Sequence, residues 1–400
     1  MAKKKKPRAT PKKRRKQTKT LTPPLSRSKT FPLLQPPPPS AFSPQGPDRK
    51  EQLANAMRDP KVSVVIVNHN GADALWNCLF ALKTQTFRPD EIILVDNAST
   101  DGSVPFVRQN YPQVDILECQ ENFGYAMGCN LGAKCATGDV IALLNNDTVV
   151  TPEWLGRMVQ TLKDGWPEVG AVASEVKPLQ ETQGSTQENN NVLNFLGRPA
   201  RGFMEREEQV FYPEGCALAY VRLLAPEGPF DDDYFLYHED IYLGWKLRLG
   251  GLQVIKALDA KVFHQGGGTM AGFPGWRAVY YDHRNRWLNL SLFLERGNLI
   301  KIFPWAAMEL AALLVRGLFT SPELFLGVSA GFIWILTRAG AIARKRSVLQ
   351  ERRKIEDQEI MCYISGRVVR DGAWFSRFLN FVSLTYCRVV GLPVMEFSRD

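Results

Sequence analysis

The chain has 400 residues, a formal net charge of +9 and seven cysteines with no Cys-x-x-Cys pair. An odd cysteine count without close pairs argues against a disulfide scaffold and fits a reducing compartment. Residues 1–20 hold eleven Lys or Arg and no acid, so the other 380 residues carry a net charge of −2. The basic character therefore belongs to the N-terminal tail, which excludes a strongly basic folded domain.

Residues 1–60 are predicted to be disordered, because a Lys/Arg-rich stretch runs into a Pro-rich one. Such a composition buries too little apolar surface to offset the entropy of ordering. No secretory signal is expected, since prolines rather than an apolar stretch follow the basic start. The tail could be a solubilising segment, or it could be attracted to anionic lipid or nucleic acid. Of these we favour the membrane.

From Lys61 onward, apolar strands alternate with amphipathic helices. Strands are predicted at 62–67, 91–95, 114–117 and 140–144, and helices at 72–86, 103–110, 125–136 and 151–163. Strands that alternate with helices predict right-handed βαβ units and a mainly parallel sheet. Further along, we expect an exposed loop at 180–191, helices at 242–249 and 277–294, and a short strand at 260–263.

After Ile302 the chain becomes apolar. Ile302–Val315 contains one acid, and Leu324–Thr337 contains no charge but has only 14 residues, fewer than the ~20 needed to span a bilayer. Basic clusters follow at 344–346 and 352–354. An apolar helical stretch beside cations is typical of a helix that lies in the membrane interface. A pair of core helices covering the sheet and a true membrane span are the alternatives.

Three predicted strands end in polar clusters, within Val64–Gly71, Ile92–Gly102 and Val140–Asp147. In α/β proteins, polar side chains at the carboxyl ends of strands form ligand sites. A carboxylate in such a place can hold Mg²⁺ or Mn²⁺ against a diphosphate, because these ions prefer oxygen ligands. The sequence therefore predicts an enzyme that uses a nucleotide-linked substrate.

At these residues the chain resembles the family 2 glycosyltransferases, and among them the bacterial rhamnosyltransferase-type members. The resembling phrases follow the family's order between Lys61 and Arg296, and they are Val64–Asn70, Val95–Ser103, Asn122–Asn130, Leu143–Thr148, Tyr237–Asp240 with Gly244–Arg248, and His264–Gly268. Any one phrase is weak evidence, but the ordered set is specific. The resemblance implies an α/β GT-A fold, with a Rossmann-like, mixed but mainly parallel sheet.

We therefore expect three regions in the chain. Residues 1–60 would form the tail, residues 61–298 the GT-A glycosyltransferase domain, and residues 299–400 a C-terminal helical region associated with the membrane interface.

The resemblance implies that five residues bind the donor, namely Asn68, Asp96, Asn122, Asn130 and Asn146. Asp96 follows the second strand, where the family recognises the nucleotide base, and a carboxylate can accept an N–H from uracil or thymine. The alternative for Asp96 is a turn cap with Ser99 and Thr100. Turn or capping duty is likewise the alternative for Asn122 and Asn130.

The family's metal motif is Asp-x-Asp, and this chain departs from it because Asn145 occupies the first carboxylate position. We expect weaker metal binding, with Asp147 as the principal ligand. The resemblance adds His264 as a further ligand, and imidazole suits Mn²⁺ better than Mg²⁺. A lone histidine beside a strand could equally be a satisfied core or loop residue. The expected cofactor is Mn²⁺ or Mg²⁺.

Glu239 and Asp240 match the family's acidic pair, which supplies the catalytic base. In an inverting transfer the acceptor hydroxyl loses its proton as it attacks the anomeric carbon, while a metal neutralises the leaving diphosphate. We assign the base to Asp240 and acceptor positioning to Glu239, an order that could be swapped. Alternatively, both acids stabilise the N-terminus of the following helix. Beyond them, Trp245, Lys246 and Arg248 could approach the diphosphate, and a role on the helix surface is the alternative for Lys246 and Arg248.

The predicted function is a metal-dependent inverting glycosyltransferase. Its donor would be a nucleoside-diphosphate sugar, dTDP-rhamnose or a UDP-hexose, and its acceptor a glycan or a lipid-linked precursor of a cell-surface polysaccharide. We expect a cytoplasmic protein, peripheral on the inner face of the plasma membrane. A degenerate relative that only binds glycan or lipid carrier is the alternative. Nucleic-acid binding through residues 1–20 is not favoured, because it would leave the acidic site unexplained. Nucleotidyl transfer is not favoured either, because Asn68–Gly71 lacks the Gly-rich, Lys-bearing loop that this reaction would need.

Overall fold

The computed structural model of the protein describes residues 57–179, 191–200, 208–266, 273–369 and 373–395. Most of the predicted tail, most of the predicted loop at 180–191, and the last two glycines of His264–Gly268 lie outside these residues.

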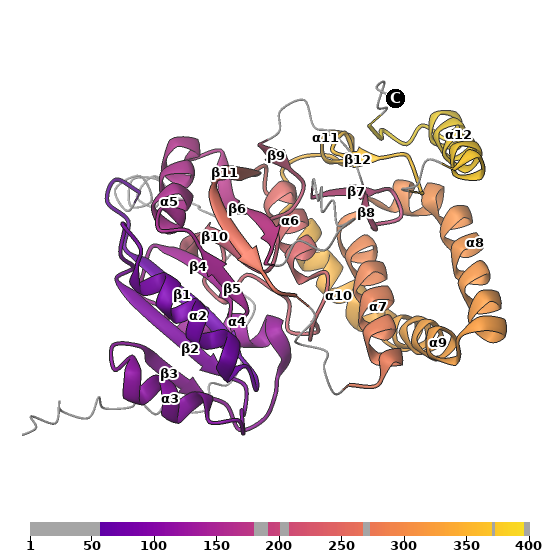
Figure 1. Ribbon diagram of the computed structural model, residues 1–400. Helices are drawn as coiled ribbons and strands as arrows, with labels where there is room; N and C mark the ends of the chain where they lie inside the picture. Colours follow the sequence, from indigo (N-terminus) through magenta and orange to yellow (C-terminus); the bar gives the residue numbers. More distant parts are fainter. Residues whose placement is uncertain (1–56, 180–190, 201–207, 267–272, 370–372, 396–400) are drawn as a thin grey trace, which may run out of the picture.

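A nine-stranded mixed sheet forms the centre of the molecule, with strand order β3-β2-β1-β4-β10-β6-β11-β5 and with β9 paired to β11 (Figure 1). Its first four strands are parallel, β10 runs antiparallel to both neighbours, and β11 is parallel to β6. This is the mixed, mainly parallel sheet that was predicted. The strands are β1 (Val62–Asn68), β2 (Glu91–Asp96), β3 (Asp115–Glu118), β4 (Val140–Asn145), β5 (Thr148–Val150), β6 (Val169–Pro178), β9 (Gln209–Val210), β10 (Ala217–Val221) and β11 (Gln253–His264).

Helices cover both faces of this sheet. Alternate residues of β1 enter two different cores, since Val64 and Ile66 belong to the core that includes residues of α2 and α5, whereas Val65 and Val67 belong to the core that includes residues of α4 and α6. Burial on both faces explains why Val64–Val67 is continuously apolar rather than alternating. The helices are α2 (Ala72–Lys83), α3 (Ser103–Asn110), α4 (Gly124–Cys135), α5 (Trp154–Gly165) and α6 (Glu239–Leu249), and the 3-10 turn η1 (Arg222–Leu224) follows β10.

The first half of the chain follows the prediction closely, and the second half departs from it. Neither β6 nor β10 was predicted, and β11 begins at Gln253 instead of residue 260. The reason in β11 is a register shift between Ala257 and Lys261, which breaks the alternation that a sequence pattern can detect. Helix α6 begins at Glu239, three residues before the predicted start, so both acids of the pair belong to its first turn.

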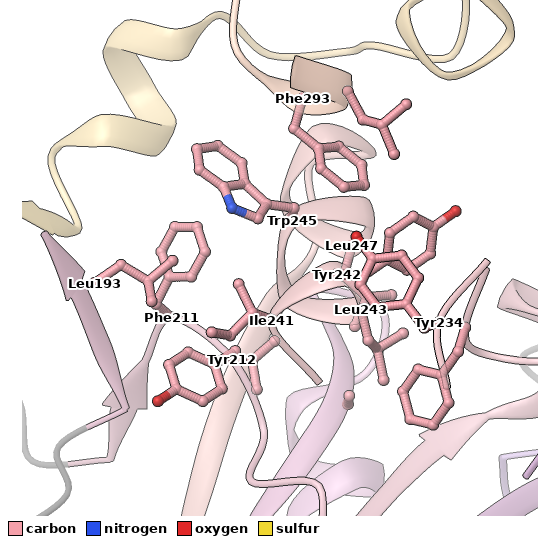
Figure 2. Packing of buried hydrophobic residues seen from close by; sticks show 14 of the residues in the cluster. Leu193, Phe211, Tyr212, Tyr234, Ile241, Tyr242, Leu243, Trp245, Leu247 and Phe293 are labelled. Carbon is pink, nitrogen blue, oxygen red and sulfur yellow. The ribbon is translucent and has the colours of Figure 1, made fainter. Parts of the chain in front are cut away.

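Helix α6 is buried on nearly all sides, which is characteristic of a central helix. Figure 2 shows its apolar residues among the strands and helices around it. Trp245 packs edge-on against Phe211 at 4.9 Å and stacks on Phe293 at 5.9 Å between ring centroids. This packing fixes the helix whose N-terminus carries Glu239 and Asp240.

The C-terminal third is helical and is joined to the rest by a small second sheet of order β12-β7-β8 (Figure 1). Helix α9 packs against both α7 and α8, and α10 packs against α7. The elements are β7 (Val192–Asn194), β8 (Pro199–Ala200), α7 (Gly275–Phe293), α8 (Arg296–Thr320), α9 (Pro322–Thr337), α10 (Ala339–Gln350), α11 (Asp357–Met361), β12 (Ile364–Ser365) and α12 (Trp374–Val389).

Helix α8 has the length and composition of a membrane-crossing helix. Its most apolar 18-residue window has a mean hydropathy of 1.5, and 17% of that window is buried. Helices α9 and α10 meet the same criterion only as a pair, with a bend of 69° between them. Core helices of soluble proteins also meet this criterion, so the finding by itself is weak evidence for a membrane.

Candidate functional site

Two adjoining cavities lie beside the carboxyl ends of β1, β2 and β4. The larger, of about 500 Å³, is lined by the turn after β1, the loop after β2, the start of α4 and the residues after β4. The smaller, of about 290 Å³, is lined by the segment before β10, the start of α6 and parts of α7 and β11. Tyr125 and Asn145 line both cavities. A ligand that fills the larger one therefore reaches the smaller one at these residues.

Of the five predicted donor residues, Asn122 and Asn146 line the larger cavity. Asn122 also accepts the N–H of Gly124 at 2.9 Å, so it caps the start of α4 as well. Asn146 donates to Asn68 Oδ1 at 2.7 Å. A Cβ atom on Gly71 would lie 2.2 Å from Asn146 Nδ2 and 2.9 Å from Asn68 Oδ1, so a larger residue there would displace the Asn146–Asn68 contact.

Asn68 and Asp96 are buried and are not among the residues that line either cavity. Asn68 Nδ2 donates to Asp96 Oδ1 at 3.3 Å and to Ser99 Oγ at 3.1 Å. The Ser99 N–H in turn donates to Asp96 Oδ2 at 2.9 Å. These bonds hold the ends of β1 and β2 together and match the turn-cap alternative. Recognition of the base by Asp96 stays a prediction.

Asn130 lies away from both cavities. Its amide donates to Phe230 O at 3.0 Å and to Asp232 Oδ1 at 3.1 Å, and its oxygen accepts the N–H of Phe230. The side chain therefore joins α4 to the loop before α6. These long-range bonds are neither the expected donor contact nor the turn or capping role, so the donor role of Asn130 stays a prediction.

The larger cavity is also lined by His69, Asn97 and Asp101, none of which was predicted. His69 Nδ1 donates to the carbonyl of Asn97 at 2.7 Å. Burial acts to raise the pKa of Asp101, but hydrogen bonds from Ser103 and the Ala72 N–H outweigh it and leave the pKa lowered. The sequence did contain a signal for Asn97 and Asp101, because both lie in the polar loop that directly follows β2. From this part of the chain, only Asp96 was predicted to bind the donor.

Strand pairing brings the predicted metal ligands together. β5 runs antiparallel to β11 with Thr148 opposite His264, which places His264 Nε2 3.2 Å from Asp147 Oδ1. Burial opposes a low pKa at Asp147, yet the interaction with His264 lowers it. Asn145 precedes Asp147 at the end of β4 and faces both cavities.

Two oxygens at this place are short of hydrogen-bond donors. They are Oδ1 of Asn145, which has no partner, and Oδ1 of Asp147, which accepts no backbone or amide hydrogen bond and has the His264 ring nitrogen 3.2 Å away; both oxygens are buried. An unpaired buried acceptor is costly unless a ligand satisfies it, and hard oxygen atoms are what Mg²⁺ and Mn²⁺ prefer. Within the described residues, no three His, Cys, Asp or Glu side chains are grouped as a metal site. The residues present therefore fit a divalent ion that takes its other ligands from a substrate.

The acidic pair lies in the smaller cavity. Asp240 is half-buried, and its carboxylate accepts N–H groups from Gly215 at 3.1 Å and from Ile241 at 2.7 Å. Burial raises its pKa, while His238 and these donors oppose the rise. Glu239 is more deeply buried and its Oε2 has no donor. Burial, and then the charge of Asp240, raise the pKa of Glu239 to about 8.

The loop before the acidic pair is held in a strained conformation by α7. Tyr237 and His238 have positive φ angles of 68° and 63°, which cost energy for residues with side chains. Asn285 donates to the carbonyls of Leu236 at 2.8 Å and Tyr237 at 2.7 Å, and Asn289 donates to that of His238 at 3.1 Å. Asn285 and Asn289 of α7 thus support the acidic pair.

Asp282 is a further acid in the smaller cavity and was not predicted. Its Oδ1 lies 3.0 Å from His238 Nε2. The hydrogen bond and charge of His238 lower the pKa of Asp282, against the effect of burial. The helical spacing of Asp282, Asn285 and Asn289 could have indicated that these three polar residues share one face of α7.

The expected approach of Trp245, Lys246 and Arg248 to the diphosphate is wrong. All three side chains are directed into the packing around α6, and none lines either cavity. Arg248 donates to the carbonyls of Val210 and Phe211, and Lys246 lies 3.4 Å from that of Pro229. Because α6 is buried on almost every side, its polar residues past the first turn bind backbone carbonyls instead.

Several known proteins are similar to this chain. The model of glycosyl transferase family 2 matches residues 63–225. The uncharacterized glycosyltransferase YwdF of Bacillus subtilis is 35% identical over 187 residues, which are 46% of this chain and 67% of that protein. The N-acetylglucosaminyl-diphospho-decaprenol L-rhamnosyltransferase of Mycobacterium tuberculosis is 26% identical over 239 residues, 50% of this chain and 75% of that one.

The O-antigen biosynthesis protein RfbC of Myxococcus xanthus is 28% identical over 51% of this chain, but the match spans only 17% of that longer protein. Among solved structures, GalNAc-T7 with UDP, GalNAc and Mn²⁺ superposes with a TM-score of 0.52 over 72% of this chain and 58% of that one, at 16% identity. At such low identity the likeness concerns the fold alone. With the family model matched from β1 to η1 and two thirds of YwdF matched at 35% identity, the chain belongs to glycosyltransferase family 2 and has the GT-A fold.

Proposed function

We propose that this chain is a metal-dependent, inverting glycosyltransferase that moves a sugar from a dTDP- or UDP-linked donor to a glycan or lipid-linked acceptor. The observation that carries the proposal is the junction of the two cavities at Asn145. The larger cavity would hold the nucleoside diphosphate and the smaller one the acceptor. The anomeric carbon would then lie between the side-chain oxygens of Asn145 and Asp147 on one side and the Glu239–Asp240 pair on the other.

Asp240 is the proposed base. Its carboxylate is held by two backbone N–H groups and has the greater exposure of the pair, so an acceptor hydroxyl can reach it. A raised pKa makes a carboxylate a better proton acceptor, provided that it stays ionised at the working pH. With its pKa near 8, Glu239 is mostly protonated at pH 7. Asp240 then carries the only negative charge of the pair, and the protonated Glu239 can donate a hydrogen bond to the acceptor.

Asp147, His264 and Asn145 would hold the metal. A bound Mn²⁺ or Mg²⁺ would neutralise charge that develops on the leaving diphosphate. Asn145 contributes an amide oxygen where the family has a carboxylate, so the protein supplies one negative charge fewer and metal affinity should depend strongly on the donor's own phosphates. His264 adds a nitrogen ligand and therefore favours Mn²⁺ over Mg²⁺.

The nature of the donor and the acceptor rests on the relatives. The name of the mycobacterial relative states L-rhamnosyl transfer and a diphospho-decaprenol acceptor, and that of the Myxococcus relative states O-antigen biosynthesis. These names support a rhamnose donor and a lipid-linked acceptor for this chain. The weakly buried, apolar α8 supports attachment to a membrane, and we place the protein on the inner face of the cytoplasmic membrane.

The proposal is tested by measuring nucleoside diphosphate release from dTDP-rhamnose and UDP-hexoses by the full chain and by Asp240→Asn. The variant should bind donor normally and lose transfer, because it keeps the shape of the side chain but not its basicity. Asp115→Asn, an exposed substitution at the far edge strand, is the matched control and should keep full activity. Normal turnover by Asp240→Asn would disprove the base assignment. Donor binding without turnover in the unaltered chain would favour the degenerate, binding-only alternative.

A further inference from the structure

Helix α12 has its polar side facing the protein and its apolar side facing outward. The residues on its inner face are Ser376, Asn380, Ser383 and Cys387, which recur at helical spacing and are small or polar. The opposite face consists of large apolar residues, namely Trp374, Phe375, Phe378, Phe381, Val382 and Val389. A helix on the surface of a soluble domain has the reverse arrangement.

Hydrogen bonds hold α12 in this orientation. Asn380 accepts the N–H groups of Val368 at 2.9 Å and Val369 at 3.0 Å and donates to the Val369 carbonyl. Ser383 donates to the Gly366 carbonyl at 2.8 Å and is fully buried. A rotation of the helix that buried its aromatic residues would break these bonds and leave several backbone groups without partners. The outward direction of the aromatic residues is therefore built into the local structure.

The aromatic residues on the outer face of α12 are largely exposed. The exposed fractions are 80% for Trp374, 56% for Phe378 and 67% for Phe381. Contiguous apolar surface of this extent marks a site that binds a partner or a membrane. Within the part of the chain that the structure describes, nothing covers these side chains.

Helix α12 is joined to α8, which also exposes apolar residues. The Tyr386 hydroxyl donates to the Lys301 carbonyl at 2.6 Å, and Lys301 Nζ donates to the Gly391 carbonyl at 2.8 Å. On either side of Lys301, Ile300 and Phe303 of α8 are 73% and 67% exposed. Figure 1 shows α8 and α12 on the side of the molecule away from the large sheet. The two helices are therefore joined at Lys301, and both leave large apolar side chains exposed.

We propose that α12, together with the adjoining part of α8, lies in the interface of an anionic lipid bilayer. Trp and Phe side chains partition into that region, and basic residues at the edge of an apolar face favour anionic lipid. Arg377 and Arg388 lie beside the aromatic face at helical spacing, and α12 contains no acidic residue. The proposal refines the membrane attachment in the proposed function by naming the surface, but lipid binding needs no catalysis and is tested apart from it.

The test is flotation of the full chain with vesicles of phosphatidylcholine and phosphatidylglycerol, and with vesicles of phosphatidylcholine alone. The triple variant Trp374→Ser/Phe378→Ser/Phe381→Ser should lose roughly tenfold or more in affinity for both, since three apolar side chains no longer insert. Phe80→Ser is the matched control, because Phe80 is 57% exposed on α2, beside the large sheet. It should float like the unaltered chain.

The charge component is tested by Arg377→Gln, which should reduce the preference for phosphatidylglycerol but keep binding to phosphatidylcholine. Equal flotation of the triple variant and the unaltered chain would overturn the proposal. So would a mass measurement by light scattering that showed a dimer of the unaltered chain and a monomer of the triple variant, because the surface would then bind a second copy. Donor binding should be the same in the triple variant and the unaltered chain. Flotation without donor binding in either would count against the proposed function and leave this inference intact.

Discussion

The clearest test of how α7 supports the acidic pair is Asn285→Ala. The substitution removes both hydrogen bonds that the amide donates, to Leu236 O at 2.8 Å and to Tyr237 O at 2.7 Å. A buried carbonyl left without a donor costs about 1–3 kcal/mol, so two of them should lower the free energy of unfolding by roughly 2–6 kcal/mol. Urea unfolding of the full chain would measure this loss.

The same substitution should also lower turnover in the protein that stays folded. Tyr237 and His238 have positive φ angles, a conformation that costs about 1–3 kcal/mol per residue and persists only when the surroundings enforce it. Without the amide the loop can relax, and Glu239 and Asp240 would move with it. A shift of about 1 Å at a catalytic group can reduce the rate by about 100-fold, so we expect kcat to fall by about 10- to 100-fold.

Asn298→Ala is the control for this prediction. Asn298 is likewise a buried asparagine on a helix, and it donates to Asp357 Oδ2 at 2.9 Å, but it lines neither cavity. Its substitution should destabilise the protein and leave kcat of the folded fraction unchanged. If Asn285→Ala lost stability but kept full kcat, as the control should, then α7 would merely stabilise the fold and the reasoning about the strained loop would be refuted.

Three further predictions concern the acidic side chains. The pKa of Glu239 rises from 4.5 to about 8 on folding, so between these pH values the native state binds a proton that the unfolded state has lost, and the native state loses stability as pH rises through this range. Glu239→Gln should therefore be more stable than the unaltered chain at pH 9 but not at pH 4. The same dependence of unfolding free energy on pH in both proteins would contradict this. Asp147→Asn should weaken Mn²⁺-dependent binding of donor by about tenfold or more, as measured by calorimetry, and an unchanged affinity would remove it from the metal site. We expect Asp282 to position acceptor hydroxyls, so Asp282→Asn should raise the KM for acceptor more than it lowers kcat. A loss of thermal stability alone would show that the contact between Asp282 and His238 is only structural.

Much of the nucleotide-binding half of the fold could be predicted from the sequence, because β1, β2 and β4 are buried on both faces. Continuous β-branched runs that stop at polar residues follow directly from that burial. Asp147 and His264 are nearly 120 residues apart, and the resemblance rather than the pattern suggested their pairing. In the structure it is the β5–β11 ladder that brings them together.

Other features could not be predicted, because they depend on tertiary contacts. The hydrogen bonds of Asn130 join two segments 100 residues apart, and no local pattern distinguishes such a tie from a ligand contact. The bulge in β11 interrupts the alternation of apolar and polar residues, so the sequence pattern predicted only the last part of that strand. The outward face of α12 could be recognised only once the partners of Asn380 and Ser383 were known, since an amphipathic pattern does not tell which side faces the protein.

The central claim is that the larger cavity binds a nucleoside diphosphate through a divalent metal at Asn145 and Asp147. A thermal-shift measurement of the full chain with UDP, dTDP, GDP and ADP, each with Mn²⁺ and with EDTA, tests it most directly. A ligand present at 100 times its dissociation constant stabilises the native state by about 2.7 kcal/mol, which is readily seen as a rise in Tm. We expect a rise with one pyrimidine diphosphate, and only with Mn²⁺. No rise with any nucleotide, or an equal rise in EDTA, would contradict the account.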